Sequence, residues 1–314
     1  MAGVEISRKP VALLSETTDR LTSVLGELEG EPVALEGGIT NRNFRARFGG
    51  ADVVVRMPGK DTALLGIDRH AEAEANRCAA AAGVAPEVVE LLDDPPCLVT
   101  RFVVGAPMEP AELREPASLE AVAAALRAVH RCPAIAATFS PFRIVEDYAA
   151  KTAARGGSIP AAFERSHHAA ARIEAALRHR PHEPVLCHND LLAANFMRSA
   201  EGLRVVDWEY AGMGDRFFDL GNFAVNNELG DAAEEAFLAA YLEEPPTAGK
   251  LAKLRLMRFM SDFREAMWGV LQGTLSDLEF DFGAYAAKHF ERLHEAECDP
   301  RFKVLLEEAG GAAS

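Results

Sequence analysis

The residues from His188 to Asp207 have the types and spacing that metal-assisted phosphoryl transfer requires. Asp190 follows a short apolar run, Asn195 comes five positions later, and Asp207 ends the next apolar segment. Their carboxylate and amide oxygens are the hard ligands that Mg²⁺ prefers. A carboxylate beside such a metal can accept the proton of an attacking alcohol. Asp and Asn also cap turns in many loops, but the order of these three residues favours transfer of a phosphoryl group to a hydroxyl.

The elements expected to position these side chains are a strand, a loop and a hairpin. Val185 to Cys187 predicts the buried strand, and Phe196-Met197 and Leu203 to Val206 predict two further strands joined by a turn at Glu201-Gly202. The hairpin would return the chain to the loop and bring Asp207 beside it.

This block resembles the choline/ethanolamine kinase branch of the aminoglycoside phosphotransferase-like kinases. The matching segments are His188-Asn189-Asp190-Leu191 with Asn195, Val206-Asp207-Trp208-Glu209-Tyr210, and Phe218-Asp219-Leu220-Gly221-Asn222. The resemblance implies an α+β, two-lobed protein-kinase-like fold, with ATP and Mg²⁺ as cofactors. It also implies Asp190 as the catalytic base and Asn195 and Asp207 as metal ligands. His188 is expected to brace the loop, and Asp219, at a helix start, to support it.

The chain is expected to divide into a β-rich nucleotide-binding lobe over residues 1–104 and a mostly helical catalytic and substrate-binding lobe over residues 105–314. The first part predicts strands around two helices, at 11–30 and 68–82, and Gly105-Ala106-Pro107 reads as a connector. Helical periodicity dominates beyond it, over 118–131, 148–155, 159–180 and 250–275.

A glycine-rich hairpin near residue 38 is the candidate phosphate loop. Its backbone N–H groups and polar side chains could hold a polyphosphate, although a plain surface hairpin fits this segment equally well on its own. The resemblance implies that Arg56 replaces the strand lysine of protein kinases and that Glu72 pairs with it. The candidate nucleotide-binding residues are Gly38, Thr40, Asn41, Asn43, Arg56 and Glu72.

The substrate-binding candidates are Tyr210, Asn226, Glu265 and Trp268. A quaternary ammonium group needs aromatic faces and a carboxylate, because it cannot donate a hydrogen bond. Choline kinases carry a Trp-x-x-Trp pair and a glutamate here, whereas this chain has Glu265 before Trp268 and Asn226 at the glutamate position. Glu265 and Trp268 share a helix face, and one hypothesis is that Glu265 replaces the missing acid. The alternative is a solvated Glu265 and a Trp268 that packs the core.

Net charge and composition limit the kinds of binding partner that this chain is expected to have. The net charge of −15 argues against nucleic acid and anionic membranes. The five cysteines are scattered, and no run approaches the ~20 apolar residues of a membrane span. A cytoplasmic enzyme acting on a small alcohol or amino alcohol, first choline or ethanolamine, is therefore expected, and a homodimer is compatible with the sequence. The alternatives are a kinase for another hydroxylated amine, such as an aminoglycoside or a thiamine-like compound, and a catalytically inactive nucleotide-binding regulator.

Overall fold

The computed structural model describes residues 10–35, 41–59, 62–94, 96–178 and 183–311. Its contacts divide the chain into two compact units, Met1–Lys60 with Pro86–Val103 and Asp61–Ala85 with Val104–Ser314. The chain passes from the first unit to the second for the last time between Val103 and Val104. The helix expected over 68–82 belongs to the second unit, because Ala75 and Ala79 pack in that unit's core. The assignment of functions to the two lobes stays a prediction.

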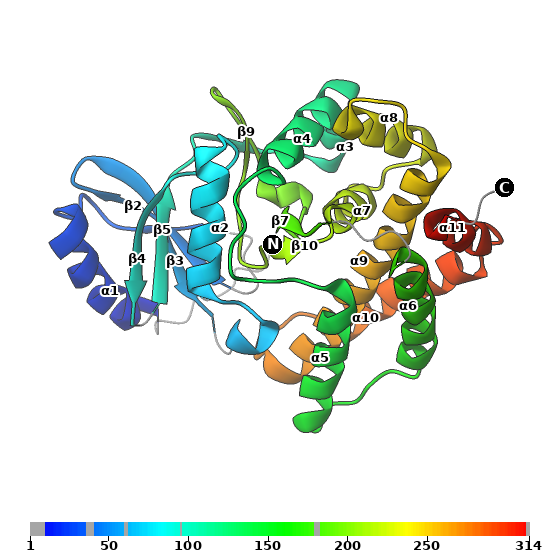
Figure 1. The fold of residues 1–314 in the computed structure, drawn as a ribbon. Coiled ribbons are helices and arrows are strands. Elements are labelled where there is room, and N and C mark those ends of the chain that lie inside the picture. The colour runs from blue at the N-terminus through cyan, green and yellow to red at the C-terminus, as the bar shows by residue number, and fades with distance from the viewer. Residues whose placement is uncertain (1–9, 36–40, 60–61, 95, 179–182, 312–314) are drawn as a thin grey trace. The chain divides into compact units, whose positions relative to one another are not determined.

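The first unit contains a five-stranded antiparallel sheet with the strand order β1-β2-β3-β5-β4, of which Figure 1 labels β2 to β5. The strands are β1 (Val33–Leu35), β2 (Asn41–Phe48), β3 (Ala51–Pro58), β4 (Val88–Asp93) and β5 (Pro96–Arg101). Gly49 and Gly50 join β2 to β3 with φ angles of 54° and 82°. A tight hairpin turn of this hand requires positive φ at both positions, which glycine adopts without strain.

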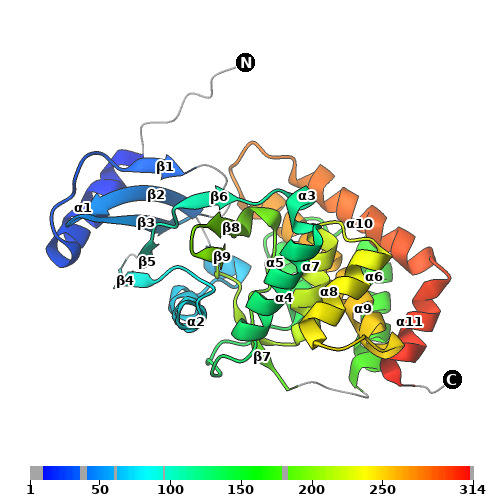
Figure 2. The same ribbon diagram turned by 90° about the horizontal axis from the view of Figure 1, so that it is seen from above.

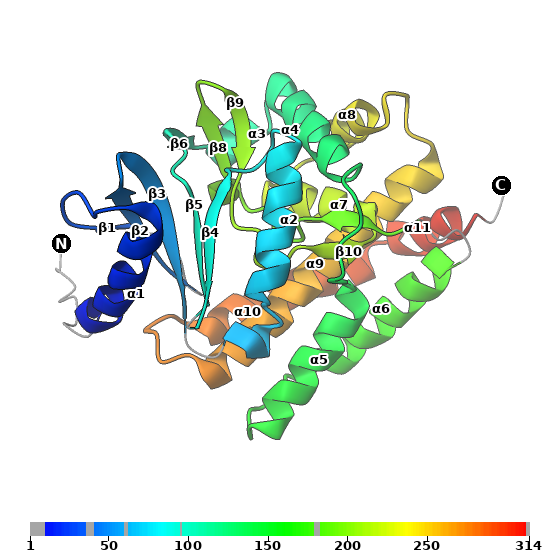
Figure 3. The same cartoon turned by 60° about the vertical axis from the view of Figure 1, so that its left-hand side comes forward.

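One face of this sheet is buried under α1 (Pro10–Leu25), as Figure 3 shows. Leu21 of the helix packs in one cluster with Phe48, Val53, Val55 and Met57, which alternate along β2 and β3 as a half-buried strand pair requires. The helix ends before Gly30, where the sequence analysis placed its end. Gly26 takes φ 94°, which stops the helix, and Leu28 forms a bridge with Phe48 instead.

The second unit is mostly helical. Its long helix α9 (Ala248–Leu275) packs against α5 (Pro141–Ala154), α6 (Ala162–Arg178), α7 (Arg216–Asn226), α8 (Asp231–Leu242), α10 (Phe282–Cys298) and α11 (Arg301–Gly310). Figure 2 shows α4 (Pro116–Val129) beside α8. The remaining helices of the described part are the 3-10 turns η1 (Thr62–Leu65) and η2 (Ala193–Asn195), α2 (Arg69–Ala81) and the short α3 (Pro110–Leu113). None of the described helices has the length and apolar character needed to cross a membrane.

Two small sheets flank the segments that contain the predicted catalytic and metal-binding residues. β7 (Val185–Cys187) pairs with β10 (Gly212–Gly214), and β8 (Phe196–Ser199) pairs with both β6 (Gly105–Pro107) and β9 (Gly202–Val205). The expected strand at 185–187 and the hairpin turning near Gly202 are confirmed. β7 is buried throughout, so the loop that follows it starts from a rigid, fully packed element.

Candidate active site

The carboxylate of Asp219 holds the backbone of the loop after β7 in place. This side chain is fully buried and accepts the backbone N–H groups of His188 at 2.8 Å and Asn189 at 2.7 Å. Two charge-assisted bonds of this kind fix the loop backbone and offset the cost of burying the charge. The expected supporting role of Asp219 is confirmed, and it lies in the first turn of α7, although it does not cap the helix. Asp215 is the residue that caps α7.

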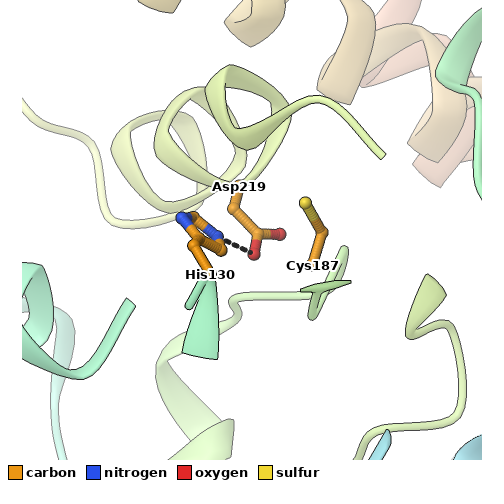
Figure 4. A group of neighbouring side chains, drawn as sticks. All are labelled: His130, Cys187 and Asp219. Atoms are coloured by element: carbon orange, nitrogen blue, oxygen red, sulfur yellow. Dashed lines mark hydrogen bonds and ion pairs between the residues drawn. The ribbon is translucent and has the colours of Figure 1, made fainter. Parts of the chain in front are cut away.

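Asp219 has a third partner in His130. The Nε2 atom of His130, at the end of α4, lies 3.1 Å from Asp219 Oδ2, and its Nδ1 atom lies 2.8 Å from the hydroxyl of Tyr241. Figure 4 shows His130 and Cys187 on either side of the carboxylate. Burial raises the pKa of the Cys187 thiol well above its usual value, so the thiol stays protonated. Because both Asp219 oxygens already have partners, this buried group supports the loop and does not form a metal site.

His188 braces the loop, as expected. Its Nδ1 atom accepts the N–H of Asp190 at 3.2 Å, and its Nε2 atom donates to the carbonyl of Val206 at 3.0 Å. These two bonds assign the tautomer that carries its proton on Nε2. Burial lowers the pKa of His188, which keeps the ring neutral. One imidazole thus connects the loop after β7, which contains Asp190 and is named the catalytic loop, to Val206, the residue before Asp207.

Asp190 lies at the end of this loop and points at a buried arginine. Its carboxylate is 14% exposed, and Oδ1 accepts a hydrogen bond from Arg264 Nη1 at 3.1 Å. The same nitrogen donates to the carbonyl of Asn189 at 3.1 Å. Burial raises the pKa of Asp190 to about 6, while the positive charge of Arg264 opposes the rise. A carboxylate with this pKa is ionised at neutral pH and is a stronger base than an ordinary aspartate.

Asn195 and Asp207 provide oxygen atoms suited to a divalent metal. The amide nitrogen of Asn195 donates to the carbonyl of Asp190 at 2.8 Å, which turns its Oδ1 atom to the opposite side. The N–H of Val206 donates to the carbonyl of Asn195 at 2.9 Å, so the chain leading to Asp207 lies against residue 195. Asp207 itself has φ 70°, an unusual conformation for a non-glycine residue. Strain of this kind is typical of functional sites. The donor set fits Mg²⁺.

Three of the four substrate-binding candidates form a cluster beside Asp190. Glu265 Oε1 accepts a hydrogen bond from Arg264 at 2.7 Å, and Trp268 Nε1 donates to the hydroxyl of Tyr210 at 3.2 Å. The Arg264 guanidinium lies 4.3 Å over the Tyr210 ring. Glu265 is only 5% exposed, so the alternative of a solvated glutamate is wrong. Arg264, which the sequence analysis missed, connects this cluster to the catalytic loop.

Asn226 is the fourth candidate. It ends α7, and the described residues provide no hydrogen-bond partner for its buried Nδ2 atom. No contact of the described residues places it with Glu265 and Trp268, so its role in substrate binding stays a prediction.

The nucleotide-binding candidates are only partly described. Asn43 and Arg56 are direct partners across β2 and β3, and Asn41 begins β2. Gly38 and Thr40 lie outside the described residues. Glu72 is buried in α2 and forms an ion pair with Arg69. The expected Glu72–Arg56 pair would join the two compact units, and it stays a prediction.

Comparison with known proteins agrees with this site. Residues 32–254 match the model of the phosphotransferase enzyme family. Ethanolamine kinase 2 of Mus musculus is 28% identical over 269 residues, covering 76% of this chain and 68% of the relative. Protein LicA of Haemophilus influenzae is 26% identical over 293 residues, covering 88% and 80%.

Solved structures agree as well. A choline/ethanolamine kinase family protein from Mesorhizobium loti has a TM-score of 0.81 at 30% identity, covering 95% of this chain and 99% of that one. The choline kinase LicA from Streptococcus pneumoniae has a TM-score of 0.76 at 23% identity, covering 90% and 98%. The chain therefore belongs to the phosphotransferase enzyme family, in its choline/ethanolamine kinase branch, and has the protein-kinase-like fold that its sequence predicted.

Proposed function

We propose that this enzyme transfers the γ-phosphoryl group of ATP to the hydroxyl of a small amino alcohol, with choline and ethanolamine as the first candidates. The observation that carries the proposal is the link between Asp190 and Glu265 through Arg264. Both carboxylates bond the same Nη1 atom, at 3.1 Å and 2.7 Å. A carboxylate that can accept the proton of the hydroxyl and a second carboxylate that can bind the ammonium group therefore lie within reach of one small molecule. The sequence relatives, which include ethanolamine kinases, support the same substrate class.

In the proposed reaction Asp190 accepts the proton of the substrate hydroxyl. The hydroxyl oxygen then bonds to the γ-phosphorus, the bond from that phosphorus to the oxygen bridging to the β-phosphate breaks, and ADP leaves. Asp190 is suited to this step because its pKa of about 6 keeps it ionised yet basic at neutral pH. The backbone bonds from His188 and Asn189 to Asp219 hold the base in place while the proton moves.

Asn195 and Asp207 would hold Mg²⁺ through their side-chain oxygens. When bound, the metal neutralises negative charge on the transferring phosphoryl group. Asn43 and Arg56, side by side on β2 and β3, would bind ATP phosphates, because a guanidinium donates two parallel hydrogen bonds to phosphate oxygens. A cytoplasmic location and a homodimer stay predictions.

The test is phosphoryl transfer from ATP to a panel of alcohols, followed by ³¹P NMR of the product. We expect a phosphomonoester of ethanolamine or choline, formed only with Mg²⁺ and with one ADP per product. Turnover of only aminoglycosides or thiamine-like alcohols would overturn the amino alcohol assignment. ATP binding without turnover of any alcohol would instead support the inactive regulator.

A further inference from the structure

We infer that the active site selects amino alcohols whose ammonium nitrogen still carries a hydrogen, and that Glu265 makes this selection. The inference rests on the proposed function and names the substrate class of the same site. It distinguishes primary, secondary and tertiary ammonium groups, which can donate a hydrogen bond, from the quaternary group of choline, which cannot.

Glu265 is a buried acceptor with two partners. It is 5% exposed, Oε1 accepts from Arg264 at 2.7 Å, and Oε2 accepts from the hydroxyl of Tyr285 at 2.7 Å. A carboxylate has about four lone-pair directions, so these two bonds leave acceptor capacity on both oxygens. A charged N–H group that reaches either oxygen forms a strong, charge-assisted hydrogen bond.

The spacing of the two acids suits a short substrate. Arg264 Nη1 bonds Asp190 Oδ1 and Glu265 Oε1 at the same time, so both acids lie within hydrogen-bond reach of a single nitrogen atom. In a 2-amino alcohol the hydroxyl and the ammonium group sit on neighbouring carbons. Such a molecule can present its hydroxyl to Asp190 and its N–H to Glu265 without further atoms between them.

A quaternary ammonium group gains much less binding free energy from the same side chains. The guanidinium of Arg264 lies over the Tyr210 ring, 4.3 Å from its centroid. The Trp268 ring packs edge to face against Phe282 and Tyr285, with ring centroids 5.8 and 5.6 Å apart. Much of the aromatic surface is therefore already in contact with the protein's own groups. Arg264 also offsets the charge of Glu265, so a cation without N–H finds neither an open aromatic cage nor an uncompensated acid. What Glu265 still offers is hydrogen-bond acceptance.

The test is a methylation series at fixed ATP and Mg²⁺: ethanolamine, N-methylethanolamine, N,N-dimethylethanolamine and choline, compared by kcat/KM. We expect the largest single drop, at least about tenfold, at the last methylation, where the final N–H is lost. A gradual decline would indicate selection by size, and a choline value equal to or above that of the dimethyl compound would contradict the inference. Either of these results leaves the proposed function standing. Absence of turnover with all four alcohols would overturn both.

Glu265→Gln and Glu291→Gln form a matched pair of variants. Glu291 is an exposed residue of α10, and its variant should keep the wild-type ratio between dimethylethanolamine and choline. Glu265→Gln should reduce that ratio at least threefold, because a neutral amide with one oxygen accepts less strongly. An unchanged ratio in folded Glu265→Gln, with folding checked by circular dichroism, would remove Glu265 from the selection.

Discussion

The support of the catalytic loop by Asp219 can be tested with a nearly isosteric change, Asp219→Asn. The native carboxylate accepts two buried backbone N–H groups, at 2.8 and 2.7 Å, and is itself fully buried. An asparagine side chain has one oxygen and one NH₂ group, so it can accept only one of these N–H groups and must face the other with a donor. Loss of one charge-assisted bond to a buried N–H costs about 1.5–3 kcal/mol.

Asp215→Asn is the matched control, because Asp215 caps the same helix through the N–H of Phe217 at 2.9 Å. Asparagine caps helices about as well as aspartate does, so this variant should change the free energy of unfolding by only a few tenths of a kcal/mol. Urea unfolding of the two variants and the wild type, with kcat measured alongside, makes the comparison. We expect Asp219→Asn alone to lose both stability and kcat. Two variants with equal unfolding free energies would refute the supporting role.

Three other predictions concern the metal, the base and the nucleotide. Asp207→Asn should bind the metal at least about tenfold more weakly, so ATP with Mg²⁺ should stabilise this variant less against heat than it stabilises the wild type. Stabilisation by ATP alone should be unchanged. If the variant loses as much stabilisation by ATP alone as by ATP with Mg²⁺, Asp207 is not a metal ligand. Burial raises the pKa of Asp190 to about 6, and the base acts only when ionised, so kcat/KM for the amino alcohol should fall as the pH drops through about 6. Arg264→Gln removes the opposing positive charge and should move this fall to higher pH, and an unchanged pH profile would contradict the assignment. Arg56→Lys should raise the KM for ATP about tenfold without changing that for the alcohol, and the reverse pattern would place Arg56 elsewhere.

The local features of the fold were predictable from the sequence because short-range patterns determine them. α2 begins after Asp68, whose carboxylate caps the helix, and Gly83 follows its end with φ 77°. The strand before the catalytic loop and the hairpin after it were also placed correctly. Boundaries were less accurate. α5 begins at Pro141 after the cap Ser140, several residues before its expected start at Tyr148.

The support behind the site could not be predicted, because it depends on contacts between residues far apart in the chain. Arg264 bonds a loop that lies 74 positions earlier, and His130 reaches Asp219 across 89 positions. The sequence did not single out Arg264, because the same helix α9 also carries Lys253, Arg255, Arg258 and Asp262. His130 gave no signal either, since a histidine at a helix end most often packs against its neighbours.

The most direct test of the account is single-turnover phosphoryl transfer by Asp190→Asn. This variant keeps the size of the side chain and removes the base. The account predicts a fall of about 10²- to 10⁴-fold in the transfer rate, with the affinity for ATP and Mg²⁺ retained. A transfer rate within tenfold of the wild type, in a folded variant that binds ATP normally, would contradict the role assigned to Asp190.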